Sequence, residues 1–296
     1  MTASPNPNQD SATAEILKAA TALGVLGGGA QGAPRILALL CNPAVNAAEV
    51  AAVMGHEPGL SLRVLRVANS AYYGLTRGVS TIDRALVLLG LDAVRGIAAA
   101  ACLDRTVKRA SEKAPIDMDA LVRHSLATAV AAEALARMHH PALAPEAFIA
   151  GLLHNLGITV QLRLDPAGVS EMIAALRALP EQDMPALEAQ RVTVGHQQCV
   201  AVLFEAWQLP AMLVDAARHH HEPMAAPEKH RKLAALVNLG IHLSLACGNT
   251  YALEPAATPR DHAVMTLLGL TDEDVDRVAA DLPERLAKLQ EAFAAG

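Results

Sequence analysis

The stretch EAFIAGLLHNLG, Glu146–Gly157, combines helix-forming apolar residues with one histidine framed by two glycines. Gly151 stands three residues before His154, and Gly157 stands three residues after it. A glycine inside a helix costs roughly 1 kcal/mol relative to alanine. Two of them around one histidine therefore indicate that a neighbouring element or a ligand comes close. We expect a buried helix over Pro145–Leu164, with a polar position inside it.

The composition around this stretch favours helices throughout. Of the 296 residues, 52% are hydrophobic and 18% are charged, as in a globular protein. Much of the apolar share is alanine, whereas aromatic residues make up only 2%. Alanine favours helix and permits close helix packing, and the scarcity of aromatic and β-branched runs argues against a sheet. The sequence predicts an all-α protein.

Breaks in the apolar pattern suggest five parts of the chain. The polar segment Lys108–Pro115 is the clearest boundary, and the glycines at 27–29 indicate a flexible connection. We expect a disordered tail over 1–13, an N-terminal helical subdomain over 14–107, a connection over 108–116, a second helical subdomain over 117–250 and a C-terminal helical extension over 251–296.

Charge and segment lengths limit the partners that we expect. The net charge is −6, and no run of lysine and arginine is long enough to follow a phosphate backbone, so we expect no nucleic-acid partner. The four cysteines form no CxxC pair, as in a reduced cytosolic protein. No secretory leader and no apolar stretch of about 20 residues is present. We therefore expect a cytoplasmic protein without a membrane partner.

The histidines are the candidate site. They are His124, His154, His196 and the His220–His221 pair. Taken singly, each could be a satisfied core residue, and the run at 219–221 could complement the negative end of a helix. Helices that carry all of them can also converge in a bundle and form a polar pocket. Periodicity alone does not decide between these interpretations.

Several stretches together resemble the HDOD family, a signalling branch of the HD phosphohydrolase superfamily. They follow the family's order and spacing over about residues 14–247: NPAVNAAEVAAVMGHEPGLSLRVLRVANSAYYG (42–74), VSTIDRALVLLGLDAVR (79–95), HSLATAVAAEALA (124–136), EAFIAGLLHNLG (146–157), GHQQCVAVLFEAWQLP (195–210) and RHHHEP (218–223). The resemblance implies an N-terminal helical bundle packed on an HD-like helical core.

The resemblance also implies a metal pocket that has lost its carboxylates. Active HD enzymes carry a histidine, a His-Asp pair and a later aspartate, and two-metal relatives add further histidines. His124 and His154 match the first two ligands, while His196 and the pair at 220–221 match the additional ones. Asn155 stands where the aspartate of the pair belongs, and Ile241 stands where the last aspartate belongs.

These replacements weaken a hydrolytic centre. An amide offers one neutral oxygen in place of a charged carboxylate, and isoleucine offers no ligand atom. Ile158 also replaces a lysine that often follows the His-Asp-x-Gly turn. We therefore expect no complete metal site and no resident cofactor, with at most weak or adventitious divalent metal at the histidines. The six positions His124, His154, Asn155, His196, His220 and His221 form a candidate ligand pocket.

The leading hypothesis is a non-catalytic regulatory protein that acts on a separate signalling protein, with a small nucleotide as a possible pocket ligand and a homodimer as a possible assembly. Tyr72 and Tyr73 could mark the contact surface, but packing between the two subdomains is the favoured interpretation, because aromatic residues often anchor cores.

Two alternatives remain open. The first is a metal-dependent phosphohydrolase acting on a cyclic or linear nucleotide, in which Glu188, Asp215 or Glu222 replaces the missing carboxylates. The second is DNA binding through two short helices within AAEVAAVMGHEPGLSLRVLRVANS (47–70), where Arg63 and Arg66 could reach phosphate or guanine. The acidic net charge and the apolar second helix argue against DNA binding.

Overall fold

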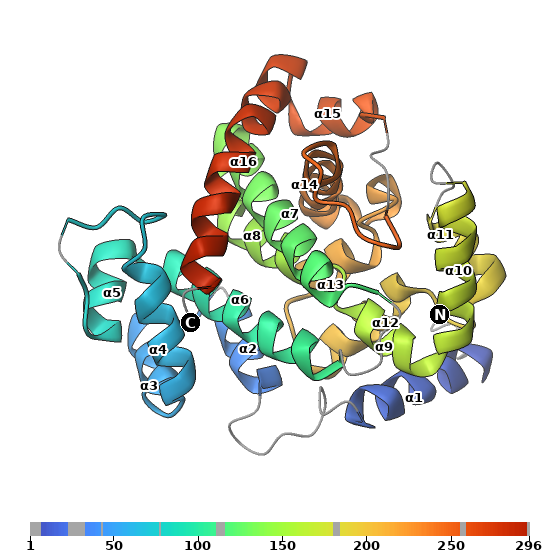
Figure 1. The fold of residues 1–296 in the computed structure, drawn as a ribbon, viewed down its shortest axis with the longest axis horizontal. Helices are drawn as coiled ribbons and strands as arrows, with labels where there is room; N and C mark the ends of the chain where they lie inside the picture. Colours follow the sequence, from blue (N-terminus) through green and yellow to red (C-terminus); the bar gives the residue numbers. More distant parts are fainter. Residues whose placement is uncertain are drawn as a thin grey trace.

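The computed structural model describes residues 7–22, 33–42, 44–76, 78–110, 116–179, 184–254 and 259–294. Over these residues the regular structure is helical, apart from a single β-bridge between Tyr251 and Glu254. Figure 1 shows the helices packed around α7 (Met118–His139). The prediction of an all-α fold is therefore confirmed.

The N-terminal helices form a bundle at one end of the molecule (Figure 1). These are α2 (Ala33–Cys41), α3 (Ala47–Gly55), α4 (Pro58–Ala68), α5 (Ile82–Leu89) and α6 (Leu91–Ala110). Arg63 of α4 donates a hydrogen bond to the carbonyl of Ala101 in α6, 3.4 Å away. This arginine is therefore part of the packing between the two helices and does not stand out toward a nucleic acid.

The first helix differs from the expectation. α1 (Pro7–Ala22) begins at Pro7, so residues 7–13 are helical and not a tail. Proline is well suited to the first helical position, and Ile16, Ala19 and Ala20 give the helix a buried face. α1 packs on α9 and α12 of the second subdomain, so residues 14–22 do not belong to the N-terminal bundle. The expected tail at 1–6 and the glycines at 27–29 lie outside the described residues.

The second subdomain contains the remaining core helices. They are α8 (Ala144–Leu153), α9 (Gly157–Leu164), α10 (Pro166–Ala178), α11 (Met184–Arg191), α12 (His196–Ala206), α13 (Ala211–Arg218) and α14 (Glu228–Ala246). α6 continues to Ala110, which shortens the expected connection at 108–116, and residues 111–115 of that connection lie outside the described residues.

The expected single helix over 145–164 is broken at residues 154–156, between α8 and α9. The break lets α9 approach α12 so closely that a Cβ atom on Gly157 would lie 2.1 Å from the carbonyl oxygen of His196. The wider segment Pro141–Leu164 is long and apolar enough to cross a membrane, but 78% of its most apolar window is buried in this core.

Two further glycines allow α8 and α14 to pack closely against α7. A Cβ atom on Gly151 of α8 would lie 2.9 Å from the Cα atom of Ala129, and one on Gly240 of α14 would lie 2.8 Å from the carbonyl oxygen of Thr128. Both distances are shorter than real Cβ contacts, so a side chain at either position would push the helices apart. The close approach predicted for Gly151 and Gly157 is confirmed.

The C-terminal extension connects the two subdomains. It consists of α15 (His262–Leu268) and α16 (Asp272–Ala294). α16 packs along α7 and reaches α4 of the N-terminal bundle (Figure 1). Its apolar stripe, which includes Val275, Leu282 and Leu289, is buried as its spacing predicts.

Candidate functional site

The structure brings the five candidate histidines together from different helices. His124 lies in α7, His154 follows α8, His196 begins α12, and the pair at 220–221 follows α13. The ring centroids of His124 and His154 lie 5.4 Å apart, and those of His154 and His220 lie 5.0 Å apart. His196 lies 5.0 Å from His220 and 5.2 Å from His221. The five rings therefore form one histidine cluster.

The cluster is sealed from solvent over most of its extent. His124, His154, His196 and His220 have 0% exposure, while the side chain of His221 retains 15%. Burial lowers the pKa of His154 and of His220 well below the ordinary histidine value, and the neighbouring imidazoles lower both pKa values further. These rings are consequently neutral at physiological pH.

Backbone carbonyls fix the tautomer of three rings. Nδ1 of His154 lies 2.7 Å from the carbonyl oxygen of Gly151, and Nδ1 of His220 lies 2.7 Å from that of Ala217. Nδ1 of His124 lies 3.0 Å from the carbonyl oxygen of Asn249. Because a carbonyl only accepts, each Nδ1 must carry the proton, which leaves a lone pair on each Nε2. Metal-binding histidines adopt this arrangement.

A carboxylate fixes the fourth ring in the same way. Oε1 of Glu188 lies 2.7 Å from Nδ1 of His196 and also accepts hydrogen bonds from the amide nitrogen of Gln161 at 2.6 Å and from the backbone of His196 at 3.1 Å. Burial acts to raise the pKa of Glu188, but the charge and hydrogen bonds of His196, with the Gln161 hydrogen bond, lower it below its ordinary value. Glu188 is thus an anion that fixes the orientation of the His196 ring through Nδ1.

The two substituted positions contribute no charge to the cluster. Asn155 is buried, donates its amide to the hydroxyl oxygen of Tyr251 at 3.0 Å, and has a carbonyl oxygen without a hydrogen bond. Ile241 is buried in α14 and offers only methyl and methylene groups.

One candidate site residue, Glu254, was not predicted from the sequence. Glu254 is 7% exposed, and its Oε2 lies 3.2 Å from Nε2 of His124 while its Oε1 lies 3.7 Å from Nε2 of His221. The bridge between Tyr251 and Glu254, with hydrogen bonds of 3.3 and 3.1 Å, turns this segment back over the cluster. No motif contains Glu254, and the expected domain boundary at 250 separated it from the histidines.

None of the three carboxylates proposed as replacements faces into the cluster. Glu188 is behind the ring of His196, Asp215 pairs with His230 at 2.6 Å, and Glu222 is exposed. The inward-facing atoms instead form two groups that could each hold a metal ion: His124, His154 and Glu254, and His196, His220 and His221. An ion held there would supply Lewis acidity, and the donor set of imidazoles with one carboxylate fits a divalent transition metal.

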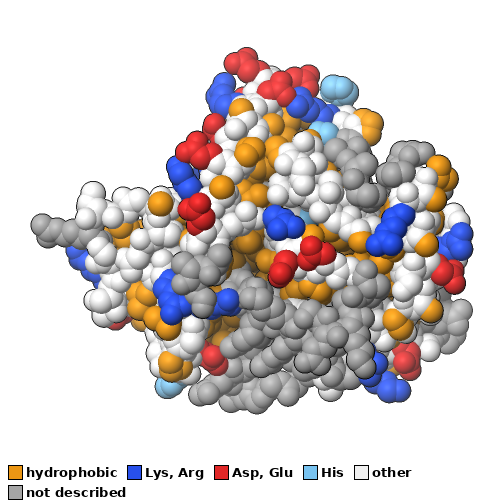
Figure 2. Space-filling model, viewed as in Figure 1, with side chains coloured by type: hydrophobic (Ala, Val, Ile, Leu, Met, Phe, Trp, Pro, Cys, Tyr) orange, Lys and Arg blue, Asp and Glu red, His pale blue; other side chains and the backbone are white. Residues whose placement is uncertain are grey.

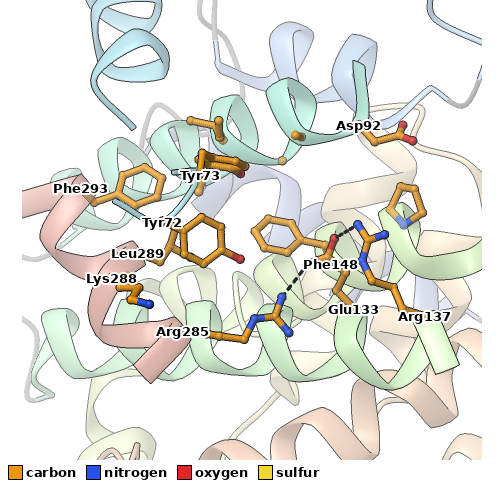
Figure 3. A pocket seen from close by; sticks show the side chains of 15 residues that line it. Tyr72, Tyr73, Asp92, Glu133, Arg137, Phe148, Arg285, Lys288, Leu289 and Phe293 are labelled. Atoms are coloured by element: carbon orange, nitrogen blue, oxygen red, sulfur yellow. Dashed lines mark hydrogen bonds and ion pairs between the residues drawn. The ribbon is translucent and has the colours of Figure 1, made fainter. Parts of the chain in front are cut away.

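A separate cavity of about 390 Å³ lies where the N-terminal bundle, α7, α8 and α16 meet (Figure 3). Tyr72 and Tyr73 line it with their rings edge to face at 4.9 Å, and burial raises the pKa of both phenols. Glu133 pairs with Arg137 at 2.7 Å and with Arg285 at 3.9 Å across its floor. This placement favours the packing interpretation of the two tyrosines.

Comparison with known proteins identifies the family and the fold. The family model described as HDOD domain matches residues 30–223. An uncharacterized protein of Treponema pallidum (strain Nichols) is 27% identical over 200 residues, which cover 66% of this chain but only 37% of that protein.

Two solved structures share the fold. A signal transduction protein of Marinobacter aquaeolei VT8 matches with a TM-score of 0.78 and 25% identity, over 97% of this chain and 65% of that chain. An HDOD domain protein of Geobacter sulfurreducens matches with a TM-score of 0.76 and 22% identity, over 96% and 99% of the two chains. The chain spans less than two thirds of the Treponema and Marinobacter proteins. With the family model covering most of its length and the histidine cluster in place, this chain belongs to the HDOD domain family.

Proposed function

We propose that the protein is a non-catalytic signalling protein that acts by contact with a separate protein, with the histidine cluster as an internal ligand site. The observation that carries this proposal is the burial of the cluster. Four of its rings have 0% exposure, and the fifth, His221, is 15% exposed and lies 3.7 Å from a carboxylate oxygen of Glu254. A phosphate ester in solution has no open position beside these atoms, which a hydrolytic metal centre must keep.

The family and the similar structures support the signalling part of the proposal. The solved Marinobacter structure carries the name of a signal transduction protein. The two substituted positions support the non-catalytic part, because an amide provides one neutral oxygen and an isoleucine no ligand atom, where active HD enzymes hold their metals with charged carboxylates.

A change at the cluster has a physical route to the surface. Asn249, Tyr251 and Glu254 contact the cluster directly, and the chain then continues to α15 and α16. α16 in turn packs on α7 and on α4. Ligand binding that shifts residues 249–254 would therefore move the helix that joins the two subdomains.

Exposed apolar side chains suggest where a partner binds. Among the described residues, large exposed hydrophobic side chains concentrate on α4 and α5, where Leu62 is 51% exposed, Val87 is 73% exposed and Leu88 is 42% exposed. On the face shown in Figure 2, acidic and basic side chains are interspersed rather than gathered by sign. Apolar contact is therefore the stronger candidate for recognition.

An activity assay tests the non-catalytic part. The purified full-length chain, supplied with Mn²⁺, Fe²⁺ or Zn²⁺, is incubated with cyclic dinucleotides, cyclic mononucleotides and nucleoside triphosphates. We expect turnover no higher than that of the His154→Ala variant. Metal-dependent turnover that disappears in this variant would instead establish the phosphohydrolase alternative, which the presence of Glu254 beside the histidines favours.

A genetic assay tests the contact part. In the source organism, a strain deleted for the gene is complemented with the wild type, with Val87→Ser/Leu88→Ser, or with the exposed control Leu179→Ser. We expect the α5 double variant to lose the wild-type transcript profile and the control to retain it. A double variant that restores the profile fully would contradict the proposed contact surface.

A further inference from the structure

We propose that Glu254 has taken over the role of the missing aspartates and, with His124 and His154, binds one divalent late first-row transition-metal ion. This inference goes beyond the proposed signalling function, because it assigns a carboxylate ligand from outside the segment that the family model matches. It rests on three features of the structure: facing lone pairs, the charge balance of the cluster and the way residues 248–254 are held.

The lone pairs are the first feature. In neutral His124 the proton is on Nδ1, so Nε2 carries a lone pair, and this atom lies 3.2 Å from Oε2 of Glu254 and 3.5 Å from the hydroxyl oxygen of Thr128. The Nε2 atoms of His196 and His220 lie 3.0 Å apart, while the Nδ1 atoms of the two rings face Glu188 and the carbonyl of Ala217. Two ligands that are cis to each other, about 2.1 Å from one ion, lie roughly 3.0 Å apart. Both contacts therefore have the spacing of ligands that share a cation.

Unsatisfied atoms extend the same pattern. The Nε2 of His154 and the Oε2 of Glu254 are buried without a hydrogen bond. A buried polar atom without a partner is costly, and ligation of a cation offsets that cost. His124, His154 and Glu254 place their ligand atoms within 4.8 Å of one another, close enough for small side-chain movements to bring all three to one ion.

The charge balance is the second feature. A divalent ion in a buried site needs negative charge nearby, and neutral imidazoles provide none. Glu254 brings one negative charge into direct contact with the ligand atoms. Glu188 brings a second one behind the ring of His196, where it strengthens that imidazole as a ligand. The group that contains Glu254 therefore takes the first ion.

The third feature is the set of contacts that positions residues 248–254. Gly248, at φ +82°, lets the chain turn after α14, and the carbonyl of Asn249 then holds Nδ1 of His124. Asn155 donates to the hydroxyl of Tyr251, and that hydroxyl in turn interacts with the carboxylate of Glu254. The amide that replaces the expected aspartate thus positions the segment that supplies the new carboxylate.

This arrangement makes the two positions interdependent. An aspartate at 155 beside Glu254 would bury two like charges, which oppose ionisation of one another. The negative charge that Asn155 lacks is therefore supplied by Glu254. The negative charge has moved from the turn between α8 and α9 to the covering segment, and the ligand now also closes the site.

Cobalt binding tests the inference. Full-length protein is freed of metal by dialysis against a chelator and titrated with Co²⁺, which reports inner ligands through its visible absorption, and thermal unfolding is followed in parallel. We expect the wild type to bind with a matching rise in Tm. Glu254→Gln should weaken binding about 100-fold or more, and Asn155→Asp/Glu254→Gln should recover it to within about tenfold of the wild type.

Controls separate ligation from damage to the fold. Glu222→Gln changes the same residue type at an exposed position and should bind like the wild type. Glu254→Asp keeps the charge on a shorter side chain and should bind more tightly than Glu254→Gln, and circular dichroism checks that each variant is helical. A wild type that binds no Co²⁺, or a folded Glu254→Gln variant that binds as tightly as the wild type, overturns the inference.

The outcomes also separate this inference from the proposed function. Metal binding with phosphate-ester turnover would support the metal site and contradict the non-catalytic proposal. A protein without metal affinity and without turnover would overturn the metal site alone.

Discussion

The two carboxylates of the histidine cluster occupy opposite ends of their imidazole partners. Glu188 contacts Nδ1 of His196 at 2.7 Å, on the side that faces away from the cluster, whereas Glu254 contacts Nε2 of His124 at 3.2 Å, on the side that faces into it. Glu188 is surrounded by donors from Gln161 and His196. The Oε2 of Glu254 has no hydrogen bond. A fully satisfied carboxylate positions a ring, and an unsatisfied one is available to a cation.

The difference also lies in where the chain places each residue. Glu188 comes from α11, next to the start of α12, and is held within one compact unit. Glu254 comes from the covering segment that leads into the C-terminal helices. The positioning carboxylate is therefore part of the HD-like core, while the inward-facing one is an addition that can respond to the rest of the molecule.

The largest effect on stability should come from a substitution that forces α9 and α12 apart. Gly157→Ala places a methyl group 2.1 Å from the carbonyl oxygen of His196 at the contact between α9 and α12. We expect a loss of about 3 kcal/mol in the free energy of unfolding, measured by urea denaturation. Gly55→Ala, at a position with open space around it, should change this free energy by less than about 0.5 kcal/mol. Equal effects would show that the close approach is unimportant.

Removing the charge of Glu188, which positions the ring of His196, should weaken metal binding less than removing the charge of Glu254, which faces into the cluster. Glu188→Gln keeps an oxygen near Nδ1 of His196 but removes the charge, and we expect Co²⁺ affinity to fall roughly 10- to 100-fold with unchanged stoichiometry. Competition with a coloured chelator measures both quantities. If Glu188→Gln lowers affinity more than Glu254→Gln, the assignment of the two carboxylates is reversed.

Acidification should destabilise the metal-free protein through both halves of the cluster. His154 and His220 have pKa values well below the ordinary value in the folded chain, so below pH 6.5 the unfolded chain binds more protons. Stability is therefore present above this pH and decreases as the pH falls. Between pH 7 and 5.5 we expect a loss of roughly 1 kcal/mol for each of the two histidines. Chemical denaturation at the two pH values checks this, and a His154→Gln variant should show a smaller loss.

The smallest effect should come from the hydroxyl that links the covering segment to Asn155. Tyr251→Phe removes the acceptor of the Asn155 amide and leaves that buried group without its 3.0 Å partner. We expect a cost of about 1 kcal/mol in the free energy of unfolding and a modest fall in Co²⁺ affinity. Calorimetry and cobalt titration measure the two, and an unchanged affinity would show that Tyr251 does not position Glu254.

Much of this fold is predictable from local pattern. Alanine content predicted the helices, and the glycines at 151 and 157 predicted close contacts that the backbone distances confirm. The five histidines were named as candidates from the motifs of the family resemblance, whereas helical periodicity alone did not decide whether they converge. The break between α8 and α9 was missed, since a continuous apolar pattern does not reveal where a helix must turn to let α12 approach.

The inward-facing carboxylate was not predictable in this way. Glu254 enters the site through a β-bridge of four residues that follows the last core helix, and neither hydrophobic periodicity nor ligand spacing marks it. The need of a metal ion for negative charge indicated that a carboxylate was missing from the motif. Only the tertiary structure shows which carboxylate lies within reach of the histidines. Of the three residues weighed from the sequence, Glu188 contacts only the outward-facing nitrogen of His196, whereas Glu254 contacts the inward-facing nitrogen of His124.

The most direct test is a crystal structure of the Co²⁺-loaded protein with diffraction recorded at the cobalt absorption edge. We predict an anomalous peak within bonding distance, about 2.1 Å, of Nε2 of His124, Nε2 of His154 and a carboxylate oxygen of Glu254. A peak held only by His196, His220 and His221, with Glu254 turned away, would contradict the assignment of Glu254 as the ligand that replaces the missing aspartates.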